Sequence, residues 1–364
     1  MTATLDRRSS TSGAPANVYA SGRLPKWSPW IILLASLVTF TTIFALVAAS
    51  DGSEFSIVGT VFFGFVLSTA VLLLVSRMVE GTRQATDRLV TSLVALAFVI
   101  ALLPLISLIF TVLTNGLARF DVEFFTFSMR NIVGEGGGAV HAIVGTLLMT
   151  GSAALISIPI GLLAAIYLVE YGRGRLARAI TFFVDVMTGV PSIVAGLFAY
   201  AVFTAVLGPG ERVGIAGALA LTVLMIPVVV RSSEEMLRLV PNELREAALA
   251  LGVPKWLVVL KVVLPTSIAG ITTGVMLAIA RVIGETAPLL VAAGFTNNLN
   301  YDLTDGRMQS LPVFVYSSYV AQGTDTQAYL DRAWAGALTL ILIVMLLNLI
   351  ARLVARYFAP KTGR

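Results

Sequence analysis

Long uninterrupted apolar runs dominate this sequence and set the first limit on its fold. A helix needs about 20 mostly apolar residues to cross the hydrocarbon core of a bilayer. Of the 364 residues, 57% are hydrophobic and only 12% are charged, whereas soluble domains carry about 25% charged residues. The sequence therefore predicts an all-α, polytopic membrane protein.

Eight runs are long enough to span a bilayer. Several are longer than a perpendicular crossing requires, so tilted helices or ragged ends are expected. The predicted spans cover residues 30–50, 55–76, 89–115, 139–169, 179–207, 213–230, 269–294 and 333–351.

The distribution of basic residues predicts the orientation of these spans. With both termini in the cytoplasm, 19 of the 25 Lys and Arg residues lie in inner segments and 5 lie outside, while Arg281 alone lies within a span. Cytoplasmic loops of membrane proteins carry such an excess. We therefore expect a multi-pass protein of the bacterial inner membrane with cytoplasmic termini, and the net charge of +5 does not indicate nucleic-acid binding.

Composition also excludes several kinds of active site. The chain has no cysteine and a single histidine, His141, so no zinc site or cysteine nucleophile is expected. None of the four lysines follows a glycine, which excludes the phosphate-binding loop G-x-x-x-x-G-K-[ST]. We expect neither enzymatic activity nor a bound metal or cofactor in this chain.

The runs divide the chain into a short N-terminal part and a larger remainder that carries the unusual polar residues. The predicted parts are a disordered cytoplasmic tail (1–29), a two-helix transmembrane hairpin (30–88), a first core helix with an external loop (89–138), a permease domain (139–353) that contains a cytoplasmic loop (232–267), and a C-terminal cytoplasmic tail (354–364).

The cytoplasmic loop 232–267 has the pattern of two short helices. Asn242 can cap a helix over 243–251, and Gly252 can end it. Pro254 suits the first turn of a second helix, which we expect to end before Pro265. By composition alone, this is an amphipathic hairpin on the inner membrane surface.

The residue identities in this loop resemble the EAA signature of ABC-importer permeases, E-A-A-x3-G-x9-I-x-L-P. The matching residues are Glu246, Ala247, Ala248, Gly252, Leu264 and Pro265, and Val262 replaces the isoleucine. The resemblance implies that the loop couples the chain to a separate ATPase. ATP and Mg²⁺ would then be bound by partner subunits.

Ionisable residues within spans are costly to insert and usually have a function. Arg281 and Glu285 lie four residues apart in the seventh predicted span, so they are expected to share one helix face. They could act on a passing solute or form a structural ion pair. For Asp185 and Arg231, a bridge between neighbouring helices is the favoured interpretation.

The chemistry of Arg281 and Glu285 suits one class of solute. A guanidinium donates paired hydrogen bonds to a tetrahedral oxyanion. A carboxylate repels an anion unless the anion carries a proton to donate, as hydrogen phosphate does and sulfate at neutral pH does not. The pair could therefore select phosphate over sulfate.

Two further segments resemble phosphate-importer permeases of the PstA type. These are the run Ala280–Leu290, which reads A-R-V-I-G-E-T-A-P-L-L, and the segment Gly189–Val194, which reads G-V-P-S-I-V. The resemblance implies an ABC-importer type I permease core, preceded here by an extra hairpin. It assigns to the substrate pathway Arg281, Glu285, Arg231, Ser192 and Thr286.

The same resemblance implies the partners. They are a homologous permease of the PstC type, two ATP-binding subunits of the PstB type, an external phosphate-binding protein of the PstS type, and membrane lipid. Two alternatives remain open: a permease for another small solute such as sulfate or molybdate, and an ion-coupled secondary transporter. The second would leave the EAA signature unexplained.

Overall fold

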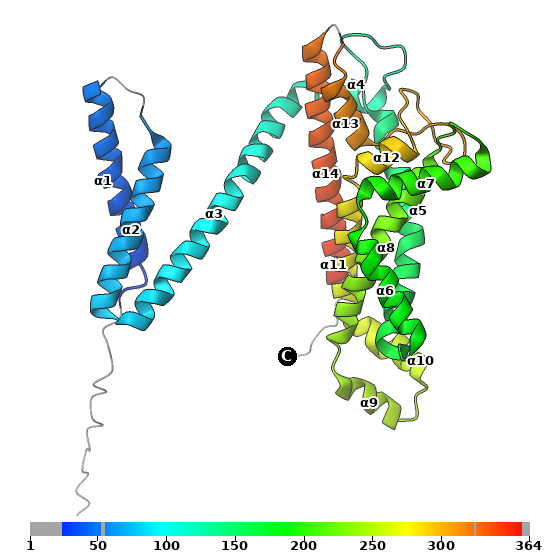
Figure 1. Ribbon diagram of the computed structural model, residues 1–364, viewed down its shortest axis with the longest axis horizontal. Helices are drawn as coiled ribbons and strands as arrows, with labels where there is room; N and C mark the ends of the chain where they lie inside the picture. The colour runs from blue at the N-terminus through cyan, green and yellow to red at the C-terminus, as the bar shows by residue number, and fades with distance from the viewer. Residues whose placement is uncertain (1–23, 52–54, 324, 359–364) are drawn as a thin grey trace, which may run out of the picture. The chain divides into compact units, whose positions relative to one another are not determined.

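The computed structural model describes residues 24–51, 55–323 and 325–358, and its regular secondary structure there is entirely helical (Figure 1). Seven helices are long and apolar enough to cross a membrane, and a bent helix pair makes an eighth span if it counts as one. The predicted all-α, polytopic fold class is thus confirmed. Residues 1–23 of the predicted N-terminal tail (1–29) lie outside the described residues, whereas Ser28 and Pro29 belong to the first helix.

Internal contacts divide the chain into two units, Met1–Leu108 and Ile109–Arg364. The division falls within α3 (Thr82–Gly116), some 20 residues beyond the end of the predicted N-terminal hairpin. Each unit is described by itself.

The first unit is built on the antiparallel pair α1 (Ser28–Asp51) and α2 (Ile57–Val79). Every fourth residue of α2 from Thr60 to Ser76 is buried, which forms one stripe facing α1. A Cβ atom at Gly64 would lie 2.7 Å from a side-chain carbon of Leu37. Small residues thus let the two backbones approach closely, as they commonly do between membrane helices.

A buried carboxylate ties together the ends of this hairpin. Glu80 accepts hydrogen bonds from the backbone amide of Leu24 (2.8 Å), the hydroxyl of Ser76 (2.8 Å), and Nε and Nη2 of Arg88 (2.6 and 2.8 Å). Chiefly because Arg88 donates to it, the pKa of Glu80 is lowered to about 2. The carboxylate therefore joins the residues before α1, the end of α2 and the start of α3.

The second unit surrounds α8 (Gly214–Arg238). In the most apolar stretch of α8, 61% of the residues are buried, against 33% or less in the other spanning helices. The remaining elements are η1 (Leu117–Arg119), α4 (Val122–Thr126), α5 (Val140–Ile166), η2 (Tyr167–Tyr171), α6 (Arg175–Gly189), α7 (Ser192–Leu207), α9 (Asn242–Ala250), α10 (Lys255–Val258), η3 (Val259–Val263), α11 (Leu264–Val282), α12 (Ala287–Ala292), α13 (Leu311–Val320) and α14 (Thr326–Phe358).

Close packing around α8 depends on glycines in its neighbours. A Cβ atom at Gly161 of α5 would lie 2.7 Å from Val229, and one at Gly274 of α11 would lie 2.6 Å from Ser232. These contacts hold α5 and α11 against α8. The elements that carry the site are thereby fixed on one central helix.

The cytoplasmic loop differs from its prediction in two respects. Asn242 is the first residue of α9 and makes no capping bond, because its side-chain oxygen instead accepts from Arg245. The second helix does not end before Pro265: α10, η3 and α11 form one continuous helix, Lys255–Val282. The wider π-helical turn η3 precedes the proline, and Pro265 then lies in the first turn of α11, where its missing N–H is tolerated.

Candidate functional site

The fifth predicted span, 179–207, is broken in the middle. It consists of α6 and α7, which bend by 108° at Val190 and Pro191 (Figure 1). The backbone of Val190 is extended, as expected for a residue before proline. Ser192 is consequently the first residue of α7 and half-buried.

The seventh predicted span is broken as well. Helix α11 ends at Val282, four residues follow outside a helix, and α12 begins at Ala287. Pro288 cannot donate to the carbonyl of Gly284, which disfavours a continuous helix at this point, whereas proline suits the first turn of the next helix. Thr286 is the N-cap residue of α12 and half-buried.

The helices that follow the two breaks, α7 and α12, pack against each other. A Cβ atom at Gly196, one turn into α7, would lie 2.5 Å from the Cα atom of Pro288. The structure thus brings together the segments that carry Ser192 and Thr286. Broken helices expose backbone groups at membrane depth, and in membrane proteins such backbone is found where it is packed in protein or lines a path.

Arg281 and Glu285 do not share a helix face, contrary to the prediction. Arg281 is in the last turn of α11 and exposed, whereas Glu285 lies in the break and is half-buried. Among the described residues the two form no ion pair with each other or with any other side chain. The interpretation as an intrahelical ion pair is therefore wrong.

Arg231 is engaged in ion pairs. It contacts Asp185 of α6, which confirms the predicted bridge between neighbouring helices, and it lies 3.0 Å from Glu234 one turn along α8. Of the five predicted pathway residues, Arg231 is thus the one whose charge is already balanced within the chain.

The residues of the EAA signature form a helical hairpin with a tight turn. Gly252 follows α9 with φ +77°, a conformation that favours glycine. The amide of Gly252 donates to Leu249 O (2.9 Å), and the amide of Val253 donates to Ala248 O (3.3 Å). This pair of bonds is the Schellman motif, so the predicted helix stop at Gly252 is confirmed.

One face of α9 packs on the protein and the other is free. Ala248 contacts the hydrophobic core, whereas Glu246 and Ala247 are exposed. At the turn, Leu251 is 84% exposed although it lies outside the spans. Leu264 and Pro265 lie at the start of α11, away from the turn.

Sequence reasoning missed the side chain that anchors α9. Arg245 is mostly buried: Nε donates to Glu170 of η2 (2.9 Å), Nη2 donates to Leu237 O (2.9 Å), and Nη1 donates to Val240 O. It therefore joins the end of α5, the end of α8 and the start of α9. The only feature of the sequence that could have pointed to Arg245 is its position immediately before Glu246, the first residue of the EAA signature.

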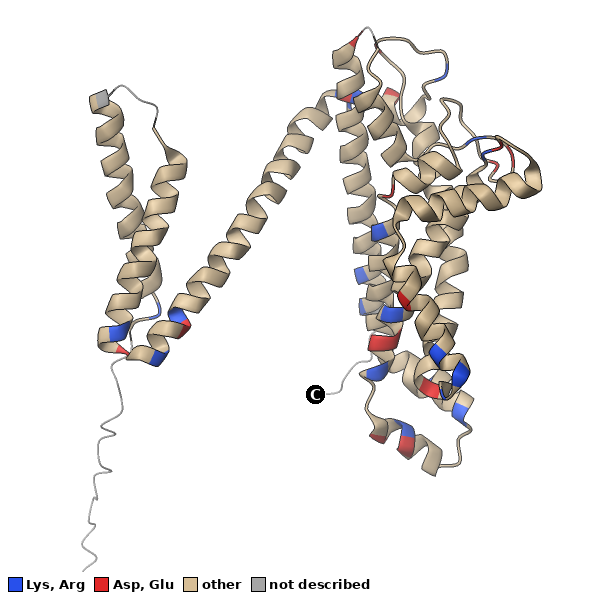
Figure 2. Cartoon of the chain, in the orientation of Figure 1, with Lys and Arg blue, Asp and Glu red and all other residues tan. Residues whose placement is uncertain are grey.

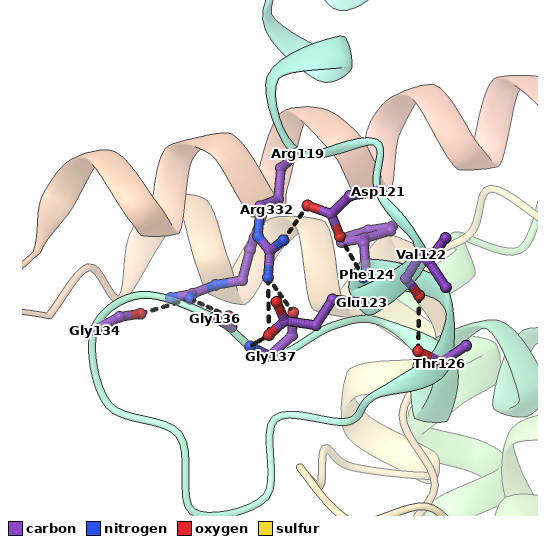
Figure 3. Close-up of polar contacts among 10 residues, drawn as sticks. All are labelled: Arg119, Asp121, Val122, Glu123, Phe124, Thr126, Gly134, Gly136, Gly137 and Arg332. Atoms are coloured by element: carbon purple, nitrogen blue, oxygen red, sulfur yellow. Dashed lines mark hydrogen bonds and ion pairs between the residues drawn. The ribbon is translucent and has the colours of Figure 1, made fainter.

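A second missed group lies at the opposite end of the unit (Figure 3). Arg332, in the second turn of α14, is 1% exposed, and its Nη1 donates to the carbonyls of Gly134 (2.6 Å) and Gly136 (2.9 Å). Its Nε and Nη2 have no acceptor among the described residues, and its guanidinium lies over the ring of Tyr329.

Arg119 holds the same glycine-rich segment at the neighbouring Gly137 (Figure 3). Its side chain pairs with Asp121 and Glu123 and donates to Gly137 O (2.8 Å). Glu123 in turn accepts from the amide of Gly137 (2.9 Å). The loop between α4 and α5 is thereby fastened to η1 and α4, and through Arg332 to the start of α14.

Comparison with known proteins identifies relatives of this arrangement. Residues 157–364 match the family described as "Binding-protein-dependent transport system inner membrane component". The phosphate transport system permease protein PstA 1 of Mycobacterium tuberculosis is 45% identical over 285 residues, which are 78% of this chain and 91% of that protein. The phosphate transport system permease protein PstA of Pasteurella multocida is 41% identical over 281 residues, 77% of this chain and 97% of that protein.

A solved structure shares the fold. A chain in the crystal structure of a bacterial alginate ABC transporter, in complex with an alginate pentasaccharide-bound periplasmic protein, aligns with a TM-score of 0.52 at 14% identity. The alignment covers 79% of this chain and 100% of that one. At this identity, the likeness concerns the fold alone.

Proposed function

This chain belongs to the family of binding-protein-dependent transport system inner membrane components, and we propose that it is the permease subunit of an ATP-driven phosphate importer. It is a multi-pass inner-membrane protein and a non-catalytic subunit. It forms the translocation path together with a homologous permease of the PstC type. Its phosphate-transporting relatives, at 41–45% identity over more than three quarters of the chain, support the cargo.

The observation that carries this proposal is the pair of broken helices with two unpaired ionisable residues beside them. The segments of Ser192 and Thr286 meet through Gly196 and Pro288. Arg281 is exposed in the isolated chain at the end of a spanning helix, where an unpaired charge is costly unless it faces a path or a partner. In the assembled importer, Arg281 donates hydrogen bonds to the passing oxyanion. Glu285 admits the anion when the anion carries a proton that it can donate to the carboxylate.

The continuous helix Lys255–Val282 supports a direct route for coupling. Its 28 residues correspond to about 42 Å of α-helix, with the Gly252 turn at one end and Arg281 at the other. A displacement of the coupling hairpin, α9 with the Gly252 turn, moves this helix as one body. Work done by the ATPase thereby reaches the break that carries Glu285.

The exposed face of α9 supports a protein partner at this hairpin. Glu246 offers a carboxylate, Ala247 leaves room for close approach, and Leu251 offers apolar surface. One of the importer's two ATP-binding subunits of the PstB type docks here, and these subunits bind ATP and Mg²⁺. The excess of basic residues in the inner segments supports a cytoplasmic position for this hairpin and both termini, and an external protein of the PstS type delivers phosphate to the other side.

Uptake by the complete complex in vesicles tests the proposal. With ATP inside and the binding protein outside, labelled phosphate should accumulate, and excess sulfate should compete poorly. Uptake that needs an ion gradient and no ATP would indicate a secondary transporter. ATP-driven uptake of sulfate or molybdate in place of phosphate would overturn phosphate as the transported solute, but the chain would still be the permease of an ATP-driven importer.

A further inference from the structure

A polar cavity of about 290 Å³ lies at the foot of the coupling hairpin, where η2, the end of α8, α9 and α10 meet. Figure 2 shows basic residues gathered in this part of the second unit. The charged residues that line the cavity are Arg173, Arg238, Arg245, Lys255 and Glu170. None of them belongs to the proposed substrate pathway.

The cavity has an excess of positive charge. Its one carboxylate, Glu170, is buried and accepts from Arg245. Arg238 pairs with Glu234 outside the cavity (2.6 Å), and Lys255 donates to the backbone carbonyl of Glu170. Arg173 has no ion-pair partner among the described residues and is exposed.

Two helix N-termini add to the positive charge of the cavity. Helix α9 begins at Asn242 and the long helix 255–282 begins at Lys255, and both residues line the cavity. The first turn of a helix carries partial positive charge and free N–H donors. The general excess of basic residues in inner segments accounts for the number of basic residues here. It does not explain why four of them line the same cavity as two helix N-termini.

We propose that this cavity binds a phosphate group, supplied either by an anionic lipid headgroup or by inorganic phosphate in the cytoplasm. Basic pockets between spanning helices on the cytoplasmic side bind anionic headgroups, and arginine recognises the same oxyanion in free form. The site goes beyond the proposed transport path, and only its assignment to the cytoplasmic side rests on the proposed topology.

A phosphate group in this cavity bridges elements that move with the coupling hairpin. Arg173 follows α5, Arg238 ends α8, and Lys255 begins the long helix. An anion that contacts all three holds the hairpin on the membrane helices. Occupancy should therefore slow local opening of this region.

Hydrogen–deuterium exchange on the assembled complex in nanodiscs tests the site locally. One arm adds inorganic phosphate to phosphatidylcholine discs, and the other arm includes phosphatidylglycerol without added phosphate. At ten times the dissociation constant, binding should slow exchange in residues 167–175 and 242–258 about tenfold. Arg173→Gln should abolish this protection, because Arg173 is the unpaired cation of the cavity.

The matched control is Arg178→Gln, which removes an exposed inner arginine that does not line the cavity. It should retain the protection. Protection in the phosphatidylglycerol arm alone identifies a lipid headgroup, and protection in the phosphate arm alone identifies the free anion. Wild-type exchange unchanged in both arms, or equal protection in Arg173→Gln, would overturn the proposal, and neither outcome depends on whether the complex transports phosphate.

Discussion

At the scale of single residues, the charges fall into two groups. Glu80, Arg231, Arg245 and Arg332 are engaged with groups inside the chain, whereas the side chains of Arg281 and Glu285 have no ion-pair partner among the residues that the structure describes. An arginine that satisfies several carbonyls fixes the position of an element. An arginine with no acceptor, at the end of a spanning helix, is available to a solute or to a partner chain.

Glu80 makes the first unit sensitive to acid. Its pKa is lowered from 4.5 to about 2, first by the bond from Arg88, so its ionised form stabilises the fold. The contribution is complete above pH 4.5 and is lost as the pH falls toward 2. We expect the amide of Leu24 to lose protection from hydrogen exchange, corrected for the intrinsic rate, between pH 6 and pH 3.

Glu80→Gln provides the comparison for this effect. The glutamine side chain cannot accept hydrogen bonds from the same set of donors as the carboxylate. Protection of the backbone amide of Leu24 from hydrogen exchange should therefore be low at both pH values. If the variant showed the same pH dependence as the wild type, another group would be responsible.

Arg332 should determine the order of the outer loop. Arg332→Ala removes the charged donor to the part-buried carbonyls of Gly134 and Gly136, and a hydrogen bond to a charged group contributes about 1.5–3 kcal/mol. We expect faster cleavage within residues 127–138 by chymotrypsin, which does not cleave after arginine. Arg130→Ala, which removes an exposed arginine from the same loop, should leave the cleavage rate unchanged, and equal rates in both variants would contradict the anchoring role.

At the scale of elements, the sequence predicts which segments are helical better than where each helix bends. Apolar length identified seven of the spanning helices, and Gly252 correctly ended α9. Proline at 191 and 288 predicts a kink or a break in each helix, but the sequence alone did not distinguish a simple kink from the 108° bend at Pro191 or the break before Pro288. Packing of Gly196 on Pro288 favours the break.

Pro265 shows the opposite error. It suggested a helix end, yet the helix continues through it after the π-helical turn η3. Contacts between distant segments, such as Arg245 with Glu170, could not be read from spacing along the chain. The candidate site was therefore predicted by residue identity, whereas its geometry required the structure.

The turn at Gly252 should be needed for coupling. With φ +77°, any other residue is strained by roughly 1–2 kcal/mol, and a β-branched side chain is the least tolerated. We expect Gly252→Val to lower the phosphate transported per ATP hydrolysed several-fold, while insertion in the membrane is retained.

Gly81→Val is the matched control for this substitution. Gly81 also has positive φ, at +92°, and open space around it, but it lies between α2 and α3. The same strain there should leave the transport ratio unchanged. An unaltered ratio in Gly252→Val would argue against the hairpin as the coupling element.

At the scale of the whole molecule, the second unit connects the coupling hairpin, which we propose binds the ATPase, to a broken pair of helices. The helix Lys255–Val282 begins beside the coupling hairpin and ends at the break before α12. The hairpin also holds α5 and α8 through Arg245. This arrangement suits a subunit that performs no chemistry itself and converts movement at its inner face into access for an anion.

The central claim is that the anion passes Arg281 at these breaks, and phosphate uptake by reconstituted complexes tests it most directly. Arg281→Gln removes a charged donor worth about 1.5–3 kcal/mol, so uptake should fall roughly 10- to 100-fold in complexes that remain assembled. Arg352→Gln, which removes an exposed arginine near the end of α14, should transport normally. Near-normal uptake by an assembled Arg281→Gln complex would contradict the account.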